Sequence, residues 1–228
     1  MTSAAERSLI DRDIAHLVHP LHNQAAHESA KVWVGGKGAY IVDSEGNEYI
    51  DCLSGLWNNT AGNGRPELAD AAAAQMRQMG FVSGYAGSSN PRAIELSERL
   101  AHLTYPSINH FYLTSGGGES TDSNIKLARY YWKLKGKPDK TKVISRIWGY
   151  HGVTLAAMCA TGIPAYWPMF EPRIPGFSHI PSPYPYLYEA PEGASQGIAA
   201  ADELEKQILE EGPDTVAMFI AEPVQGAG

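Results

Sequence analysis

The sequence lacks long apolar runs, and none approaches the roughly 20 residues that a membrane-spanning helix needs. Residues 1–14 are polar and charged, so they also lack the apolar core of a signal peptide. Basic residues are too few for a nucleic-acid surface, because 18 Lys and Arg stand against 25 Asp and Glu, a net charge of −7. These absences argue against membrane-spanning and nucleic-acid-binding proteins and favour a cytoplasmic location.

Cysteine is also scarce. The two cysteines, Cys52 and Cys159, lie far apart in apolar contexts, which predicts reduced core residues and no disulfide framework. Histidines gather near the start of the chain, but no carboxylate or cysteine stands at ligand spacing beside them, so the sequence predicts no metal site. These histidines are His16, His19, His22 and His27.

What is present is a globular composition, with 43% hydrophobic and 19% charged residues in 228. That length suffices for one large domain or two small ones. Short strand-like runs at 32–34, 39–42 and 49–51 predict a small antiparallel unit, with turns at Gly35-Gly36 and 43–47. The helices predicted in the first half cover Ser3–Val18, Pro66–Met79 and Pro91–Leu103, and a glycine-rich, site-like loop spans 52–64.

The chain is organised around the stretch from Asn109 to Tyr131, which predicts strand, glycine turn and helix. Phe111–Leu113 suit a strand, and Gly116–Gly118 remove every Cβ from the turn. The helix that follows, to about Leu134, adds unpaired N–H groups and the positive end of its dipole. Such a turn binds an anion, most often a phosphate. A flexible glycine loop that binds nothing is the alternative.

The second half predicts a parallel sheet, because a strand at Lys142–Trp148 after the long helix completes a βαβ unit. Ligands bind at the carboxyl ends of such strands. The glycine turn and the Gly149-Tyr150-His151-Gly152 segment both follow strands, so we expect them to meet on one edge of the sheet. The remaining predictions are an ordered surface loop at Pro164–Pro191, a helix at Ala200–Leu209 and a strand buried on both faces at Thr215–Ala221.

The last strand leads us to expect a fragment. A strand buried on both faces needs a helix to cover it, and none follows the 222–228 segment. Only three or four core strands can be placed, fewer than the roughly five or six of an average sheet. A small complete α/β domain is the alternative.

Five motifs stand in one order along the sequence: Leu53-Ser-Gly-Leu-Trp-Asn-Asn, Gly62-Asn-Gly-Arg-Pro-Glu-Leu-Ala69, Ser115-Gly-Gly-Gly-Glu-Ser120, Ile144-Ser-Arg-Ile-Trp-Gly-Tyr-His-Gly152 and Ala221-Glu-Pro-Val-Gln-Gly226. From about His19 onward the chain resembles the N-terminal half of a class-III aminotransferase, in the omega-aminotransferase group of pyridoxal-phosphate enzymes. The resemblance implies fold type I: an α/β, three-layer fold with a mostly parallel sheet and a small N-terminal antiparallel unit. Residues 1–60 would belong to the small domain and 61–228 to an incomplete cofactor-binding large domain.

The resemblance also implies the residues that bind pyridoxal 5′-phosphate. Gly117 and Gly118 match the pair whose backbone holds the phosphate, although the family usually carries Ser or Ala where Gly118 stands. Tyr150 matches the aromatic residue that stacks on the pyridine ring, and His151 completes its motif. Glu222 matches the acidic residue that orders the surroundings of the cofactor.

Three further positions are interpreted in the same way. Trp57 and Tyr85 match positions that line the substrate pocket, with plain core packing as the alternative. Arg146 is expected to be a structural or salt-bridging residue and not a catalyst.

The activity implied is transfer of an amino group from an amine or omega-amino acid to a 2-oxo acid such as pyruvate, by a homodimer when the chain is complete. No catalytic residue is assigned, because the family's Schiff-base lysine lies after the 221–226 motif, and Lys126, Lys133 and Lys142 do not match it. The isolated chain is therefore expected to be inactive.

Three alternatives remain open at this point. One is an aminomutase or racemase with the same cofactor. The second is a non-catalytic α/β protein that binds phosphate or a partner chain. The third, a nicotinamide dehydrogenase, lacks the G-x-G-x-x-G spacing.

Overall fold

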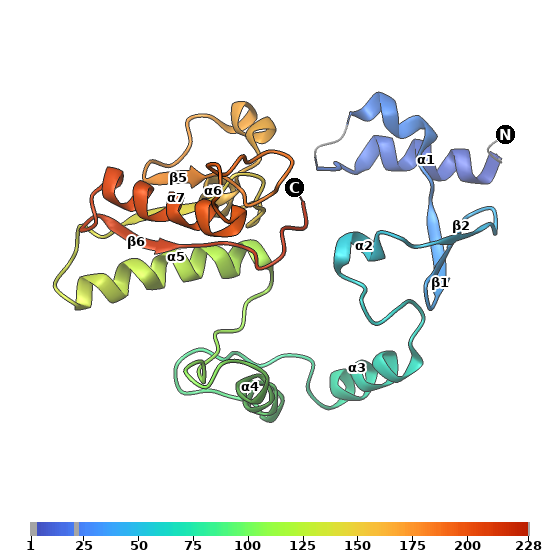
Figure 1. The fold of residues 1–228 in the computed structure, drawn as a ribbon. Coiled ribbons are helices and arrows are strands. Elements are labelled where there is room, and N and C mark those ends of the chain that lie inside the picture. The colour runs from blue at the N-terminus through green and yellow to red at the C-terminus, as the bar shows by residue number, and fades with distance from the viewer. Residues whose placement is uncertain (1–3, 21–22, 228) are drawn as a thin grey trace. The chain divides into compact units, whose positions relative to one another are not determined.

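The computed structural model describes residues 4–20 and 23–227, in two compact units that divide between Arg99 and Leu100 (Figure 1). Ser3 and His22, which figured in the predictions above, lie outside the described residues. No helix in the described part of the chain is both long and apolar enough to cross a membrane.

The first unit contains the predicted antiparallel sheet, in the strand order β1-β2-β3. Helix α1 precedes the sheet and ends four residues before Pro20, close to the prediction. Helices α3 and α4 begin at the predicted prolines, and α3 ends at Gly80. The elements are α1 (Ala4–His16), the 3₁₀ helix η1 (Gln24–Ser29), β1 (Trp33–Lys37), β2 (Tyr40–Asp43), β3 (Glu48–Ile50), α2 (Ser54–Trp57), α3 (Pro66–Met79) and α4 (Pro91–Leu103), whose last turn lies past the division between the units.

The first predicted turn is wrong. Gly35 and Gly36 lie inside β1 and pair with β2, and the chain turns later, at Gly38, with a left-handed φ of 58°. A Cβ on Gly36 would lie 2.8 Å from both the carbonyl oxygen of Tyr40 and the Cβ of Asn63. Glycine is therefore required there by a close approach between two segments and not by a turn.

The second turn of this sheet is built around a buried carboxylate, that of Asp43. It accepts hydrogen bonds from the backbone of Glu45 and Asn47 at 3.0 and 2.9 Å and from the Tyr49 hydroxyl at 2.9 Å. Lys31 Nζ lies 3.2 Å away. Burial alone would raise the pKa of Asp43, but the bonds from Asn47, Tyr49 and Lys31 outweigh it and lower this pKa below its usual range.

The second unit contains a parallel sheet with β4 at its centre, in the order β5-β4-β6. Ile144 of β4 packs with Ile180, Val216 and residues of α7, whereas the neighbouring Ser145 bonds Ala160 of α6 at 2.7 Å. Successive strand residues point to opposite faces, so α7 and α6 cover opposite faces of the sheet. The elements are α5 (Gly117–Leu134), β4 (Lys142–Arg146), α6 (Leu155–Ala160), η2 (Pro164–Phe170), β5 (Phe177–Ile180), α7 (Gln196–Glu211) and β6 (Val216–Phe219).

Helix α5 runs alongside β6, at the edge of the sheet (Figure 1). The indole N–H of Trp132 donates to the carbonyl oxygen of Ala217 at 2.7 Å, which joins α5 to β6. The helix ends at Leu134, where the sequence predicted its end. The predicted α/β fold, with a parallel sheet and a separate antiparallel unit, is therefore present.

Three predictions in this unit are wrong in detail. Phe111–Leu113 form no strand, because no segment among the described residues pairs with them. The region from Pro164 to Pro191 is not only a loop, since it contains β5. Strand β6 lies at an edge of the described sheet, and of its residues only Val216 is buried.

The cysteine prediction is half right. Cys159 is buried in α6, where burial raises the pKa of its thiol, and it pairs with no other cysteine. Cys52 is exposed and also free, so it is not a core residue in this structure.

Candidate cofactor site

The first part of the site is the glycine turn at the head of α5 (Ser115–Gly118). Gly116 is its extended N-cap, and the helix begins at Gly117. The N–H groups of a first helical turn have no acceptor within the helix. A Cβ on Gly116 or Gly117 would meet no atom within 4 Å, so the approach to these amides is open. The turn itself is fixed by a 2.9 Å bond from the Ser115 N–H to the Glu119 carboxylate.

The second part is the 149–152 segment, which follows the carboxyl end of β4. The chain bends at Trp148, whose φ is 66°, and the Trp148 N–H donates to the Gly162 carbonyl at 2.7 Å. The Gly162 N–H in turn donates to Gly149 at 2.8 Å. A Cβ on Gly162 would lie 2.0 Å from the carbonyl oxygen of Arg146, so only glycine fits there. These contacts fix the backbone next to Tyr150, whose side chain is exposed.

The two parts touch each other. A Cβ on Gly152 would lie 2.7 Å from the Cα of Gly118, and Gly152 has a left-handed φ of 126°. The Thr121 hydroxyl donates to the carbonyl of His151 at 2.8 Å, and the Thr154 hydroxyl donates to that of Gly118 at 3.3 Å. The glycine turn and the 149–152 segment therefore meet, as predicted. Neither threonine could be singled out from the sequence alone.

Glu222, just after β6, joins this assembly through the backbone of Tyr150. The Tyr150 N–H donates to one carboxylate oxygen of Glu222 at 2.9 Å, and the Gly226 N–H donates to the other at 3.2 Å. Arg146 bonds the Glu222 carbonyl at 3.4 Å and lies 5.5 Å from the centre of the Phe219 ring. Arg146 is thus a structural residue here, as predicted.

Gln225 is a residue that sequence reasoning missed. Its side-chain amide donates to the Ile147 carbonyl at 3.0 Å, and its amide oxygen accepts a hydrogen bond from the buried Ser182 hydroxyl. These residues follow β6, β4 and β5 respectively, so Gln225 joins the carboxyl ends of all three described parallel strands. It lies inside the 221–226 motif, which was the available signal.

His151 belongs to the 149–152 segment and is buried. Its backbone N–H donates to the Thr161 hydroxyl at 2.9 Å, and its Nε2 has no hydrogen-bond partner among the described residues. Burial lowers the pKa of its imidazole, and the carboxylate of Glu222 opposes this effect only in part. The side chain is therefore held in its neutral form.

Trp57 and Tyr85 lie in the first unit, and the residues described above lie in the second. The exposed fractions of their side chains are 53% and 85%, so core packing is not their role in this unit. Trp57 ends α2, a single turn with a left-handed backbone, where Ser54, Leu56 and Trp57 have φ of 49°, 61° and 66°. Such a conformation costs non-glycine residues roughly 1–2 kcal/mol each and is concentrated at functional sites.

A hollow of about 320 Å³ lies beside this left-handed turn and within the site-like loop predicted from the sequence. Glycine and small polar residues form its walls. The lining residues are Gly38, Ala39, Asp51, Ser54, Asn59, Thr60, Ala61, Gly62 and Asn63.

The aminotransferase class-III family model matches residues 23–228, and the chain belongs to that family. It is 39% identical to a putrescine–pyruvate aminotransferase of Pseudomonas aeruginosa over 208 residues. The matched region covers 91% of this chain and 46% of the relative. It is 40% identical to a diaminobutyrate–2-oxoglutarate transaminase of Halomonas elongata, over 97% of the chain and 49% of the relative. The chain thus spans about half the length of these relatives.

Solved structures give the same assignment. An (S)-enantioselective omega-transaminase from Thermomicrobium roseum matches with a TM-score of 0.90 and 46% identity, over 100% of this chain and 51% of that one. The omega-transaminase of Pseudomonas jessenii, solved in complex with PMP, matches with a TM-score of 0.88 and 35% identity, over 96% and 49%. The predicted family and fold type are confirmed, and the family depends on pyridoxal phosphate.

Proposed function

We propose that the protein carrying this chain is a pyridoxal-phosphate-dependent transaminase that moves an amino group from an amine or omega-amino acid to a 2-oxo acid. The observation that carries the proposal is the direct contact between the glycine turn and the 149–152 segment, with Glu222 bonded to the backbone of Tyr150. The relatives named for putrescine, diaminobutyrate and γ-aminobutyrate support this class of donors. Pyruvate and 2-oxoglutarate, which occur in those names, are the acceptors to test first.

The residues present fit the cofactor. The amides of Gly117, where the approach is open, and of Gly118, at the positive end of α5, would hold its phosphate. The exposed ring of Tyr150, held by the bond from its N–H to Glu222, would lie against the pyridine ring. When bound, the cofactor supplies an electron-withdrawing ring that makes the Cα proton of an amino substrate removable.

Gly118 is suited to this place for a steric reason. A Cβ there would lie 3.3 Å from the Cγ2 of Thr154, which is a tight contact. The family usually carries Ser or Ala at this position, so the hydroxyl that Ser offers in some members is absent here. One lost hydrogen bond would weaken phosphate binding by about 0.5–1.5 kcal/mol.

Trp57 and Tyr85 are proposed to line the pocket for the amine. The strained backbone at Trp57 and the exposure of both rings support this role. A related transaminase in which one tryptophan is replaced by glycine has been engineered for the synthesis of bulky amines. We therefore expect Trp57→Gly to raise activity toward bulky amines relative to putrescine. We further propose that the complete protein is a homodimer.

The test is a transamination assay of the protein that carries this chain, with putrescine, 4-aminobutyrate and 2,4-diaminobutyrate as donors. Pyruvate or 2-oxoglutarate should be converted to alanine or glutamate at the rate at which the donor loses its amine. An isomerised amino acid formed with no acceptor consumed would contradict the proposal and indicate a mutase or racemase.

A binding measurement tests the cofactor residues separately. Tyr150→Ala should weaken pyridoxal-phosphate binding roughly 3- to 10-fold, because it removes the aromatic face. Tyr150→Phe, which keeps the ring, should bind nearly as the parent does. The exposed Tyr186→Ala is the matched control and should leave affinity unchanged.

A further inference from the structure

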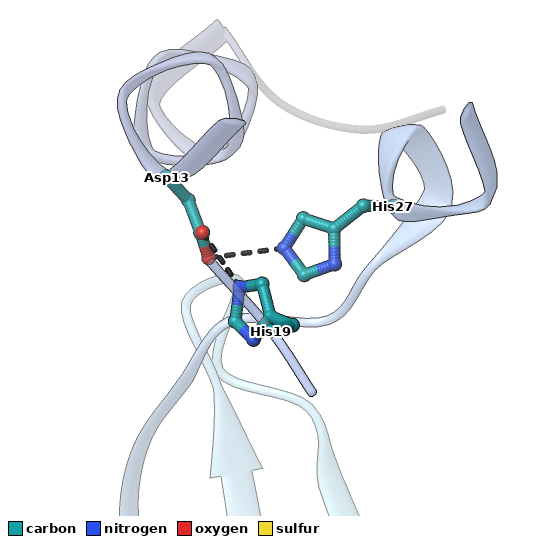
Figure 2. Close-up of side chains that lie close together, drawn as sticks. All are labelled: Asp13, His19 and His27. Carbon is teal, nitrogen blue, oxygen red and sulfur yellow. Dashed lines mark hydrogen bonds and ion pairs between the residues drawn. The ribbon is translucent and has the colours of Figure 1, made fainter. Parts of the chain in front are cut away.

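Three side chains from separate segments of the first unit converge on one point (Figure 2). Asp13 lies in the last turn of α1, His19 follows that helix, and His27 belongs to η1. The Nε2 of His19 lies 2.7 Å from one carboxylate oxygen of Asp13, and the Nε2 of His27 lies 3.0 Å from the other. Figure 2 shows both imidazole rings directed at the same carboxylate.

The arrangement is held by local structure and is partly shielded from water. Asn23 caps η1 by accepting the N–H of Ala25 at 3.0 Å, which fixes the turn that carries His27. The two imidazole rings stack with their centres 4.3 Å apart. The exposed fractions of the side chains are 13% for His27, 24% for Asp13 and 32% for His19. The three groups are thus positioned together and remain reachable from solvent.

We propose that Asp13, His19 and His27 form a binding site for one first-row divalent transition-metal ion, with Zn²⁺ as the ion that fits it best. Two imidazole nitrogens and one carboxylate oxygen are a usual three-ligand set for Zn²⁺, with a water in the fourth position. The three ligand atoms all lie within 4.8 Å of one another. These three residues belong to the first unit, whereas the residues proposed to bind the cofactor belong to the second.

The distances from Asp13 to the two histidines are close to those expected if a metal ion replaced the protons that these groups share. Ligand atoms about 2.0–2.2 Å from a tetrahedral ion lie roughly 3.3 Å apart. The 2.7 and 3.0 Å distances run from His19 and His27 to different oxygens of Asp13, and they would have to lengthen by about 0.3–0.6 Å, which side-chain rotations can supply. An ion at the centre would then join α1 to η1 through three bonds.

The sequence predicted no metal here, because no carboxylate appeared at ligand spacing beside the histidines. Asp13 stands six residues before His19 and 14 before His27, and those separations match no linear metal motif. The three side chains come together because η1 folds back beside α1. The alternative is a purely structural cluster in which the histidines bond Asp13 and no ion binds.

The test uses the chain without a polyhistidine tag, after dialysis against a chelator, titrated with ZnCl₂ in a calorimeter. We expect one saturable Zn²⁺ per chain and a rise in melting temperature on binding, since an ion that binds the folded state stabilises it. Asp13→Asn and His27→Gln should each weaken binding by at least roughly 10-fold and abolish the rise. His102→Gln, an exposed histidine in the last turn of α4, is the matched control and should bind as the parent does.

A second measurement does not depend on the variants being folded. The Zn²⁺ X-ray absorption spectrum of the parent chain should report two imidazole nitrogens and one or two oxygens at roughly 2.0–2.2 Å. Absence of saturable binding, a spectrum without two imidazoles, or unchanged affinity in folded Asp13 and His27 variants would each overturn the site. None of these readouts uses transaminase activity, so failure here leaves the proposed function untouched.

Discussion

The backbone N–H of Tyr150 donates a 2.9 Å hydrogen bond to the side chain of Glu222, although 72 residues separate the two in sequence. The bond connects the segment after β4 to the segment after β6. It is a charge-assisted bond, and such bonds are stronger than those between neutral groups. The orientation of Tyr150 therefore depends on a residue from a neighbouring strand.

Removing this acceptor should loosen the 149–152 segment. Glu222→Ala leaves the N–H groups of Tyr150 and Gly226 without their carboxylate, and we expect a loss of about 1–2 kcal/mol of stability. Glu222→Gln keeps one acceptor oxygen and should lose less. Urea titration measures the loss, and amide hydrogen exchange at Tyr150 locates it. Glu210→Ala, an exposed glutamate in α7, is the control; a change of equal size there would contradict the argument.

Gly152→Ala should be strongly destabilising. The added methyl would lie 2.7 Å from the Cα of Gly118, and the left-handed φ of 126° disfavours any side chain. We expect a loss of about 1–3 kcal/mol in urea unfolding. Gly197→Ala is a control of opposite sign, because a Cβ there meets nothing within 4 Å and the position is helical. It should gain up to about 1 kcal/mol, and equal effects of the two substitutions would refute this interpretation.

Leu56→Gly should stabilise the first unit. Leu56 is an exposed leucine with a φ of 61°, so glycine relieves backbone strain and loses little packing. The expected gain is about 0.5–1 kcal/mol in thermal or urea unfolding, after the entropy cost of glycine is counted. Leu68→Gly, at an equally exposed position inside α3, should instead lose about 0.5–1 kcal/mol. If both variants lose stability, the left-handed turn is not strained.

Stability should fall on mild acidification because of His179. Burial, aided by the charge of Arg173, lowers the pKa of this imidazole to about 4, whereas an unfolded histidine titrates near about 6.5. Between those values the unfolded chain binds more protons than the folded chain, so the free energy of unfolding decreases as pH falls from about 6.5 toward about 4. Unfolding measured across this range should show that decrease.

The matched variant is His179→Phe, which keeps a ring beside Trp167 but cannot titrate. It should flatten the pH dependence in part, and only in part, because burial also lowers the pKa of His151. A histidine NMR titration of the parent should give a midpoint well below 6 for His179. A midpoint near 6.5 would show that the ring is not buried in solution.

The helices could be predicted from the sequence because their ends carry local signals. Proline stands at the first position of α3 and α4, and glycine follows the ends of α3 and α5, so the chain itself marks these boundaries. The antiparallel strands were found from short apolar runs between turn residues. The same logic failed at Gly35-Gly36, because glycine used for a close approach looks in sequence like glycine used for a turn.

The elements predicted least well were strands that form only by pairing with distant segments of the chain. Phe177–Ile180 is short and places Ser178 and His179 at its centre, so no local pattern distinguishes it from loop, yet pairing with β4 makes it β5. Phe111–Leu113 has the composition of a strand but no ladder partner among the described residues. Composition cannot report a hydrogen bond to a segment many residues away.

The residues of the site likewise divide into those that could be predicted from the sequence and those that could not. The glycine turn was found from its residues and from the helix that follows it, and the roles expected of Tyr150 and His151 came from the resemblance. Thr121, Gln225 and Asp13 were missed, because each acts through a partner brought near only by folding. Among them only Gln225 had a signal in the sequence, which was its place inside the 221–226 motif.

The close approach of Gly152 to Gly118 has one mechanical consequence. The main chains of Gly152 and Gly118 pack directly against each other, with no side chain between them that could move aside. The wall that would face the phosphate and the wall that would face the aromatic ring must therefore shift together or stay still together. A ligand held by both segments would therefore meet a surface that is already formed before it binds.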